Sequence, residues 1–497
     1  MSHKTKEELG REAAGLWASM KDKALAPKDR MAIPAQEMAT RDPVSRAREM
    51  GEVALGYTEE QARVEAARCL GCKNRPCVAS CPVGVPIPEF IACVEKGEFK
   101  KAVDTIKTTN LLPAICGRVC PQEKQCQSTC TLGKSLKSVD KAVAIGRLER
   151  FVADWERENG LISTPEVAQN TGKRVAVIGS GPAGLTVAAD VRREGHEVTV
   201  FEAFHKTGGV MVYGIPEFRL PKAIVQKEVE VLKSMGVEFR TNFLVGRTET
   251  LAELLDREGF DAAFVGTGAG LPKFMDIPGE SYIGVFSANE YLTRANLMKA
   301  YDTEKAATPL FPAKVVGVVG GGNVAMDACR MALRLGAEKV YCIYRRTRDE
   351  MPARAEEIAH AEEEGVEFRF LQNPTRILAD ADGKVRAVEV LDYELGSPDE
   401  SGRRSPVAKA GTEHEIPVDA MIIALGNESN PLMAQTTAGL DVTKRGNIIV
   451  DAEQRTSIAR VWAGGDIVLG AATVILAMGE GRKAAKSINE YLASKKN

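Results

Sequence analysis

The cysteines are concentrated in one short part of the chain. Nine of the eleven lie between residues 69 and 130, and eight of these form two runs that each hold four closely spaced thiols and one Cys-Pro step. The first run contains Cys69, Cys72, Cys77 and Cys81, and the second contains Cys116, Cys120, Cys126 and Cys130. Closely spaced cysteines that end before a proline are typical of ligands to 4Fe-4S clusters. The sequence therefore predicts two 4Fe-4S clusters that share ligands across the runs.

Structural zinc is the alternative, because zinc is also bound by four thiolates. Zinc sites usually pair two Cys-x2-Cys knuckles across a loop, whereas four thiols within thirteen residues favour a cluster. Disulfides are a poor explanation in a reducing cytosol. Cys93 lies in an apolar helical pattern, and Cys329 and Cys342 lie in later helix and strand patterns with no partner cysteine nearby. We expect these three thiols to belong to the core.

A nucleotide-binding pattern begins at Arg174. An apolar strand over 174–179 leads into a Gly-x-Gly-x-x-Gly turn and an amphipathic helix that ends near 194, and a strand over 197–201 ends at Glu202. The glycines let a pyrophosphate approach the helix N-terminus, and a carboxylate at this place accepts hydrogen bonds from the ribose. This order of parts predicts a Rossmann-type dinucleotide site.

The pattern occurs a second time, with one informative difference. A strand over 314–320 precedes a second glycine turn, a helix is expected over 326–335, and a strand over 339–344 ends in Arg345 and Arg346. Arginine at this place pairs with a 2′-phosphate, which a carboxylate would repel. The alternative is that both arginines are solvated charges at a strand end. An acid in one copy and arginines in the other indicate two nucleotides, a flavin and NADP(H).

Later segments support a duplicated unit. Apolar strands over 261–268 and 419–426 follow the two turns, and a polar excursion over 378–415 is expected to form a hairpin and loop. If the second unit is inserted into the first, the strand before Asp466 and a helix over 471–488 return to complete the flavin site, where Asp466 would hold the ribityl chain. The alternative for Asp466 is an ordinary strand-to-helix turn. The predicted FAD contacts are Gly179, Gly181, Pro182, Ala183, Gly184, Glu202, Gly209, Gly465, Asp466 and Thr473, and the predicted NADPH contacts are Gly320, Gly322, Asn323, Val324, Ala325, Arg345 and Arg346.

The whole chain must supply the elements that position these groups. Its 497 residues predict about three domains, at about 150 residues per domain. The net charge of −2 gives no general basic excess for nucleic acid, and no segment is long and apolar enough to span a membrane. The first residues also lack the apolar core of a signal peptide. We therefore expect a soluble cytoplasmic protein that binds neither nucleic acid nor membrane.

The chain resembles the small (β) chain of NADPH-dependent glutamate synthase and its relatives from about residue 34 to the end. The relatives include the large subunit of NADH-dependent ferredoxin:NADP oxidoreductase (Nfn), sulfide dehydrogenase and the N-terminal half of dihydropyrimidine dehydrogenase. The segments over 54–62 and 72–77 look closer to the Nfn and sulfide dehydrogenase branch. The motifs that carry the resemblance are ALGYTEEQA at 54–62, RCLGC at 68–72, CGRVCP at 116–121, IGRLERF at 145–151, YGIPEFRLPK at 213–222 and MPAR at 351–354.

The resemblance implies an α/β fold, in which an α-helical, ferredoxin-like iron–sulfur domain precedes two Rossmann-type domains of disulfide-reductase-like architecture. The expected domains are an N-terminal extension (1–50), a helical domain with two 4Fe-4S clusters (51–165), the first part of the FAD domain (166–300), an inserted NADPH domain (301–428) and the FAD return segment (429–497). The first thirty or so residues are expected to form a polar amphipathic helix that contacts another subunit. By the same resemblance Cys69, Cys72, Cys77 and Cys130 hold one cluster, and Cys81, Cys120, Cys126 and Glu149 hold the other. Counting thiols alone would choose Cys116 instead of Glu149.

The expected function is electron transfer between NADPH, FAD and the two clusters, with no side-chain acid or base in the hydride step. The implied acceptor is ferredoxin or a small iron–sulfur or flavin partner subunit, with electron bifurcation at the FAD considered for the Nfn type. The alternatives are the small chain of a glutamate synthase that feeds a large chain, and a non-catalytic wiring subunit of a larger redox complex. A hetero-oligomer is expected in each case.

Overall fold

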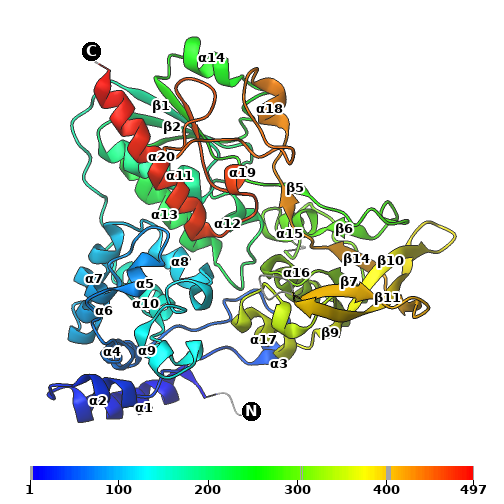
Figure 1. Ribbon diagram of the computed structural model, residues 1–497, viewed down its shortest axis with the longest axis horizontal. Coiled ribbons are helices and arrows are strands. Elements are labelled where there is room, and N and C mark those ends of the chain that lie inside the picture. The colour runs from blue at the N-terminus through cyan, green and yellow to red at the C-terminus, as the bar shows by residue number, and fades with distance from the viewer. Residues whose placement is uncertain (1–3, 303, 305, 399–403, 496–497) are drawn as a thin grey trace.

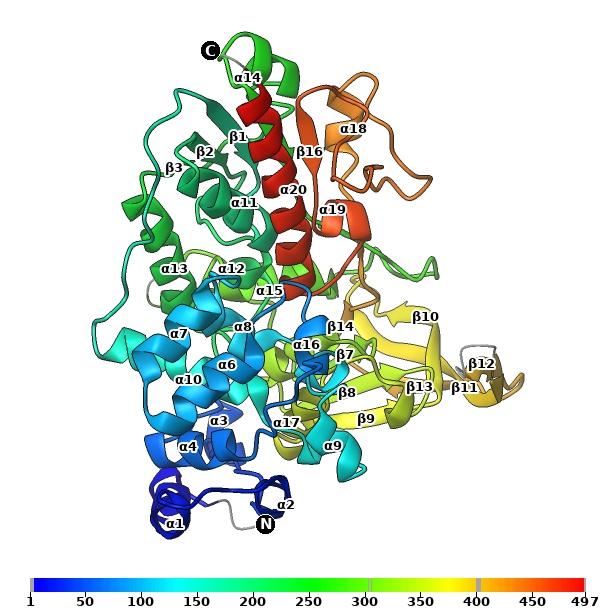
Figure 2. The same cartoon turned by 60° about the vertical axis from the view of Figure 1, so that its left-hand side comes forward.

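The structure is a computed structural model that describes residues 4–302, 304, 306–398 and 404–495. The predicted N-terminal extension therefore begins outside the described residues, at 1–3. Within the described chain, an N-terminal group of helices packs below a first parallel sheet, and a second parallel sheet lies beside both (Figures 1 and 2). The C-terminal helix, α20 (Val474–Ser494), runs along the first sheet beside α11 (Pro182–Arg193). It ends at the side of this sheet that lies away from the N-terminal helices (Figure 1).

The first sheet has the order β16-β4-β1-β2-β3, with all neighbours parallel. Its apolar strands are buried by helices on both faces, as expected for a parallel sheet. The last strand in the chain, β16, returns to pair with β4, so the second sheet is inserted between two parts of the first. The strands are β1 (Arg174–Ile178), β2 (Glu197–Phe201), β3 (Glu238–Arg240), β4 (Ala262–Val265) and β16 (Val461–Ala463), and the further helices of this part are α12 (Val210–Tyr213), α13 (Lys222–Ser234), α14 (Leu251–Asp256), α18 (Leu432–Thr436) and α19 (Asp466–Leu469).

The second sheet repeats this arrangement in the order β6-β14-β7-β8-β9. β14 occupies the place that β4 has in the first sheet, which agrees with the internal repeat. β6 lies in this second sheet, although its residues fall in the predicted first part of the FAD domain; the domain limits themselves stay a prediction. The elements are β6 (Val285–Ser287), β7 (Val315–Val319), β8 (Lys339–Tyr344), β9 (Glu367–Phe370), β14 (Ala420–Ile423), α15 (Ala288–Asn296), α16 (Asn323–Arg334) and α17 (Ala355–Glu363), with a short antiparallel pair, β5 (Leu271–Pro272) and β15 (Asn427–Glu428), between the two sheets.

The polar excursion differs from its prediction. Instead of a hairpin and loop it forms an antiparallel sheet of β10 (Gln372–Ala379), β11 (Val385–Pro398), β12 (Arg404–Ala408) and β13 (His414–Pro417), whose inner side chains join a buried cluster with the second sheet. Apolar residues alternate along β11, and this period-2 pattern explains why it forms a strand. Residues 399–403 of this excursion lie outside the described part of the chain.

Ten α-helices are described before the first sheet, and the cysteine runs lie on α5, on α8 and on the turns near them. α6 buries Phe90, Ile91 and Val94 and ends at Gly97, which has a left-handed backbone (φ +82°). α10 packs on α8 and places Phe151 edge-on to Phe99 of α7. The helices are α1 (Lys6–Met20), α2 (Pro27–Ala32), α3 (Pro43–Arg46), α4 (Glu59–Ala67), α5 (Pro76–Ala79), α6 (Ile87–Lys96), α7 (Phe99–Lys107), α8 (Pro113–Val119), α9 (Thr131–Ser135) and α10 (Ile145–Glu158).

The N-terminal residues form two helices, α1 and α2, where one was expected. α1 buries Leu9, Ala13 and Met20 and packs against α4. The Arg63 guanidinium of α4 lies over the Trp17 ring, 4.4 Å from its centre. The apolar side of α1 is therefore covered, at least in part, by this chain's own helix.

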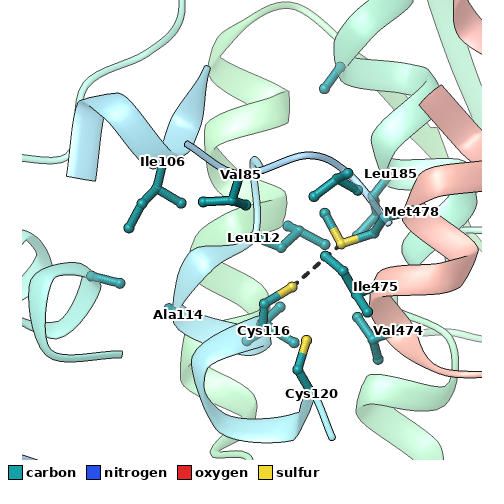
Figure 3. Close-up of a cluster of buried hydrophobic side chains, with 14 of the residues drawn as sticks. Val85, Ile106, Leu112, Ala114, Cys116, Cys120, Leu185, Val474, Ile475 and Met478 are labelled. Carbon is teal, nitrogen blue, oxygen red and sulfur yellow. Dashed lines mark hydrogen bonds between the residues drawn. The ribbon is translucent and has the colours of Figure 1, made fainter. Parts of the chain in front are cut away.

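One buried cluster joins the helical domain to the first sheet. In Figure 3, Cys116 of α8 faces Met478 of α20, and Leu185 of α11 lies beside it. The Cys116 thiol lies 3.6 Å from the Met478 sulfur. Because these side chains belong to one continuous core, the cysteine-bearing helices and the first sheet hold a fixed arrangement. No described helix is long and apolar enough to cross a membrane.

Candidate functional site

A cavity of about 770 Å³ lies between the two sheets and receives residues from both glycine turns. Nine of the ten predicted FAD contacts line it, and Gly184 is the one that does not. Of the predicted NADPH contacts, Asn323 and Val324 line it, whereas Gly320, Gly322, Ala325, Arg345 and Arg346 do not. The lining FAD residues are Gly179, Gly181, Pro182, Ala183, Glu202, Gly209, Gly465, Asp466 and Thr473.

The first turn places a carboxylate at the end of β2. The backbone N–H of Ser180 donates to Glu202 at 3.0 Å, and the N–H of Phe204 donates to its other oxygen at 2.9 Å. Gly179 has φ +100°, and a Cβ there would lie 2.5 Å from the Gly266 carbonyl oxygen. Only glycine fits here, because the backbone after β1 passes so close to the backbone after β4. Without a side chain, the turn leaves its backbone accessible to a pyrophosphate. The residues present therefore fit a dinucleotide.

The second turn repeats the same crossing. Gly320 has φ +142°, and a Cβ there would lie 2.4 Å from the carbonyl oxygen of Ala424 at the end of β14. α16 begins at Asn323, directly after the glycines and three residues earlier than predicted, so its N-terminus faces the turn. This geometry also fits a dinucleotide.

The two predicted phosphate arginines have different surroundings. Arg345 is exposed at the end of β8. Arg346 is buried, and its Nε donates to the Arg404 carbonyl oxygen at 3.0 Å. Only Arg345 is therefore open to an incoming phosphate without a change of partner.

The C-terminal return supplies the remaining wall of the cavity. α20 begins at Val474 and ends at Ser494, whereas the prediction was 471–488, because the Thr473 hydroxyl caps the helix by accepting from the Leu476 N–H. Burial raises the pKa of Asp466 to about 6, and a backbone hydrogen bond from Ala472 opposes that rise. Asp466, Thr473 and Val474 all line the cavity.

Two lining residues were missed by the sequence analysis. The Arg219 guanidinium donates to one oxygen of Asp327 at 2.8 Å, and the other oxygen has no hydrogen-bond partner in the described part of the chain. Burial raises the pKa of Asp327 to about 6, although Arg219 lowers it. Both residues line the cavity. Two sequence features could have identified them. Asp327 lies one helical turn after Asn323, and Arg219 belongs to the motif YGIPEFRLPK.

A second, smaller cavity of about 30 Å³ lies among the cysteines. Cys81, Cys120, Cys126 and Glu149 line it, which are the four side chains predicted for one cluster. Cys116 is absent from this lining; its thiol faces the Met478 sulfur at 3.6 Å and the Asn110 side-chain oxygen at 3.7 Å (Figure 3).

Glu149 has the surroundings of a metal ligand. It is buried, it accepts a hydrogen bond from the Asn110 amide at 2.7 Å, and it forms no ion pair with any described residue. Burial raises the pKa of Glu149 to about 8. A buried carboxylate without a cation is costly, and a metal removes that cost. The donor set therefore fits an iron–sulfur cluster with one oxygen ligand.

The other four predicted ligands lie nearer the surface. Cys69, Cys72, Cys77 and Cys130 are each partly exposed. Burial, together with the charges of neighbouring thiols such as Cys130, raises the pKa of Cys69 to about 11 and that of Cys77 to about 12. The fold therefore brings thiols of both cysteine runs together. Within the described residues, no three His, Cys, Asp or Glu side chains converge on one point as the ligands of a single metal ion do.

The two cavities share one wall. Val119 and Pro121 line the large cavity, and Cys120, the residue between them, lines the small one. From the other side, Val474 lines the large cavity and Ile475 the small one. A single layer of chain thus separates the predicted flavin site from the predicted cluster with the Glu149 ligand.

The remaining cysteines are buried as predicted, with one correction. Cys93 lies on α6, Cys329 on α16 and Cys342 on β8, and all three are buried. Cys329 and Cys342 are neighbours in the fold: after burial, a hydrogen-bond contact with Cys342 is the next cause of the raised pKa of the Cys329 thiol. Because the two cysteines lie on different elements, the sequence did not indicate that they are neighbours.

Comparison with known proteins matches both the cysteine-rich part and the dinucleotide-binding part of the chain. The family described as dihydropyrimidine dehydrogenase domain II, 4Fe-4S cluster matches residues 46–161, and the family described as pyridine nucleotide-disulphide oxidoreductase matches residues 173–481. FprA from Mycobacterium tuberculosis, solved in complex with NADPH, has a similar fold, with a TM-score of 0.54 and 19% identity over 65% of this chain and 84% of that chain.

Two relatives extend the match to almost the whole chain. The glutamate synthase [NADPH] small chain of Escherichia coli is 37% identical over 450 residues, which cover 89% of this chain and 94% of the relative. The NADP(+)-dependent formate dehydrogenase subunit beta of Moorella thermoacetica is 38% identical over 471 residues, covering 89% of this chain and 64% of the relative. The chain belongs to the glutamate synthase small chain family, and it is an iron–sulfur flavoprotein oxidoreductase of that type.

Proposed function

We propose that this chain oxidises NADPH and delivers the electrons singly, through its iron–sulfur domain, to a partner chain. The observation that carries the proposal is the wall shared by the two cavities, where Cys120 lies between Val119 and Pro121. When bound, FAD supplies two-electron hydride chemistry and the clusters supply one-electron transfer. The chain's own part is to hold these groups close together and in order.

The first glycine turn and the C-terminal return would hold FAD. The N-terminus of α11 faces the turn and favours the negative charge of a pyrophosphate. Glu202 is fixed by the N–H groups of Ser180 and Phe204 and would accept hydrogen bonds from the ribose. Asp466 and Thr473 lie at the far side of the cavity, next to the N-terminus of α20, where the flavin end of the molecule would lie.

The second turn would hold NADPH at Gly320, Gly322, Asn323, Val324 and Ala325. Arg345 is open to the 2′-phosphate, and Arg346 reaches it only by releasing the Arg404 carbonyl. Asp327 and Arg219 lie where both turns meet the cavity, so they would border the reacting rings and exclude water from them.

The cysteines support two clusters in a fixed order. Cys81, Cys120, Cys126 and Glu149 would hold the inner one, beside the large cavity, and Cys69, Cys72, Cys77 and Cys130 the outer one, at the surface. Two four-iron clusters correspond to about eight irons per chain. Electrons would leave from the outer set, whose thiols are partly exposed.

The partner is proposed to be a large chain or a small iron–sulfur protein. The relatives are a small chain and a β subunit by name, and their match supports the small-chain type better than the bifurcating Nfn type. A hetero-oligomer and a cytoplasmic location are part of the same proposal. The segments 69–81 and 124–138, which hold most of the predicted ligands, contain five Lys or Arg residues and no Asp or Glu. This surface would attract an acidic acceptor.

The test is the activity and content of the anaerobically purified chain. We expect about eight irons and one FAD per chain, and NADPH-dependent reduction of an artificial one-electron dye without any partner. Nucleotide binding without dye reduction would support the non-catalytic wiring subunit instead. A yellow protein that lacks the brown iron–sulfur absorption, and contains zinc, would contradict the proposed clusters.

A further inference from the structure

We propose that Arg354 couples nucleotide binding at the second glycine turn to the cysteine loop over 116–126. Arg354 is the last residue of the MPAR motif and directly precedes α17, at the N-cap position. The inference rests on the proposed NADPH site, because it assigns a consequence to occupancy of that site. Arg354 is a positioning residue in this account, since it lines neither the large cavity nor the small one.

The backbone of the motif is tied to the nucleotide turn. The Arg354 N–H donates to the Asn323 side-chain oxygen at 2.9 Å, and the Ala353 N–H donates to the Gly321 carbonyl oxygen at 3.2 Å. Asn323 is the first residue of α16 and lines the large cavity. A nucleotide that orders this turn therefore acts directly on the peptide of Arg354.

The side chain of Arg354 crosses to the iron–sulfur domain. Its Nη1 donates to the Arg118 carbonyl oxygen at 2.8 Å, and its Nη2 lies 3.3 Å from the Gln122 side-chain oxygen. The Lys124 ammonium donates back across the same junction, to the Pro352 carbonyl oxygen at 2.6 Å. The junction thus joins the motif to Arg118 and Gln122, the residues on either side of the segment 119–121.

Gln122 carries the contact into the small cavity. Its amide donates to the Cys116 carbonyl oxygen at 3.2 Å, and its side chain lines the cavity with Cys120 and Cys126. Gly146 of α10 holds it in place, because a Cβ on Gly146 would lie 2.1 Å from the Gln122 amide nitrogen. Gln122 and Arg354 also line a cavity of about 210 Å³, so a shift of Arg354 would move the loop, break the hydrogen bond or displace these side chains into that cavity.

The junction is incompletely satisfied in the described structure. The Arg354 Nε and one oxygen of Glu123 are buried without hydrogen-bond partners, and the Arg354 Nε lies 3.7 Å from the other Glu123 oxygen. Buried polar groups of this kind gain free energy from a small rearrangement that pairs them. In a second arrangement of the junction, the Arg354 Nε would donate to the Glu123 carboxylate. Nucleotide binding would favour that arrangement.

The test is amide hydrogen exchange in the full-length, cofactor-loaded chain, with and without NADP+. In the unmodified chain we expect NADP+ to slow exchange in 116–126 by about fivefold or more, the lower end of usual coupling factors. Arg354→Met should abolish this response, whereas Arg348→Met, an exposed arginine of the same loop, should retain it. Because Arg354→Met could disturb folding, Gln122→Met provides a second variant that removes the acceptor from the other domain.

An independent measurement is the reduction potential of the clusters. A fivefold coupling corresponds to a shift of about 40 mV on NADP+ binding, at 59 mV per tenfold for one electron, and Arg354→Met should remove it. NADP+ binding that leaves exchange in 116–126 unchanged, or a response that persists in both variants, would overturn the coupling alone. Failure of the unmodified chain to bind NADP+, measured by titration of the flavin absorbance, would overturn the proposed function and the coupling together.

Discussion

At the scale of single residues, buried carboxylates with an incomplete set of partners mark the important positions. Glu149 and Asp327 are both buried carboxylates with raised pKa values, and each lines one of the two cavities. Within the described residues, one Asp327 oxygen has no hydrogen-bond partner, and Glu149 accepts a hydrogen bond from Asn110 but forms no ion pair. Such positions are expected where a ligand supplies the missing interaction.

Replacement of Glu149 tests the choice between oxygen and sulfur in the inner cluster. Glu149→Ala should reduce the iron content from about eight to about four per chain, because one cluster loses a ligand. Cys116→Ser is the matched control and should leave the iron content unchanged. Iron loss in Cys116→Ser with full iron in Glu149→Ala would reverse the assignment.

Asp327 gives a prediction on pH and stability. A folded pKa of about 6, against about 3.9 in the unfolded chain, means that the unfolded state releases this proton first as pH rises. The unmodified chain should therefore lose up to about 3 kcal/mol of stability between pH 4 and pH 6, and no more above that range. The Asp327→Asn chain has no carboxyl group at this position and should not show this loss. The stability of the unmodified chain relative to Asp327→Asn should therefore fall between pH 4 and pH 6.

The measurement is the unfolding midpoint in denaturant at several pH values, with flavin content as a check on folding. A difference between the two proteins that stays constant from pH 4 to pH 7 would show that the carboxyl titrates normally. Removal of the Arg219 partner should raise the folded pKa of Asp327 further, because Arg219 lowers it, and so extend the loss of stability to higher pH.

At the scale of elements, the sequence predicts the limits of strands better than those of helices. The limits of β2 and β8 agree with the predicted 197–201 and 339–344, because short apolar runs bounded by turns define buried strands well. Helix limits were less accurate: α20 starts later than predicted because of the Thr473 cap, and α1 and α2 divide one expected helix.

The relations across the chain could not be predicted from local patterns. The Arg46 side chain is fully buried against Glu364, which directly follows α17 and lies more than three hundred residues away, and nothing near Arg46 in sequence indicates this pair. The contact between Arg219 and Asp327 and the pairing of Cys329 with Cys342 arise in the same way. The glycine turns and cysteine runs were recognisable because their chemistry requires fixed local spacing.

The contact of α20 with the first cysteine run gives a prediction at this scale. A Cβ on Gly479 would lie 2.9 Å from the Pro82 carbonyl oxygen, directly after Cys81. Gly479→Val should therefore push α20 away from the inner cluster and slow electron transfer from flavin to cluster, while NADPH still reduces the flavin at the usual rate. Stopped-flow absorbance separates these two phases.

Lys486→Val is the matched control, because Lys486 is exposed on the same helix. It should leave both phases unchanged. Equal rates in Gly479→Val and the unmodified chain would show that the contact of α20 with Pro82 does not set the distance between the two sites.

At the scale of the whole molecule, the proposed cofactor sites would form a path from the second sheet to the surface of the helical domain. The path ends in two segments that carry Lys73, Arg75, Lys124, Lys134 and Lys137, all exposed, and no carboxylate. The net charge of the chain is only −2, so this excess is local. Local charge of one sign steers an oppositely charged partner to the electron exit.

The rate of electron delivery to an acidic acceptor should therefore fall with salt. Lys73→Glu together with Lys134→Glu should slow reduction of an acidic iron–sulfur protein by about tenfold at low ionic strength, with little effect on a neutral dye. Arg247→Glu, far from the cysteines in sequence, is the control. A salt-independent rate, or an equal loss in the control, would place the electron exit elsewhere.

The most direct test of the account is rapid-freeze electron paramagnetic resonance of the holoprotein mixed anaerobically with NADPH and a one-electron acceptor. The account predicts that a reduced iron–sulfur signal appears after flavin reduction and at least as fast as the acceptor turns over. Flavin that bleaches while the acceptor is reduced, with the clusters never passing through a reduced state, would contradict it.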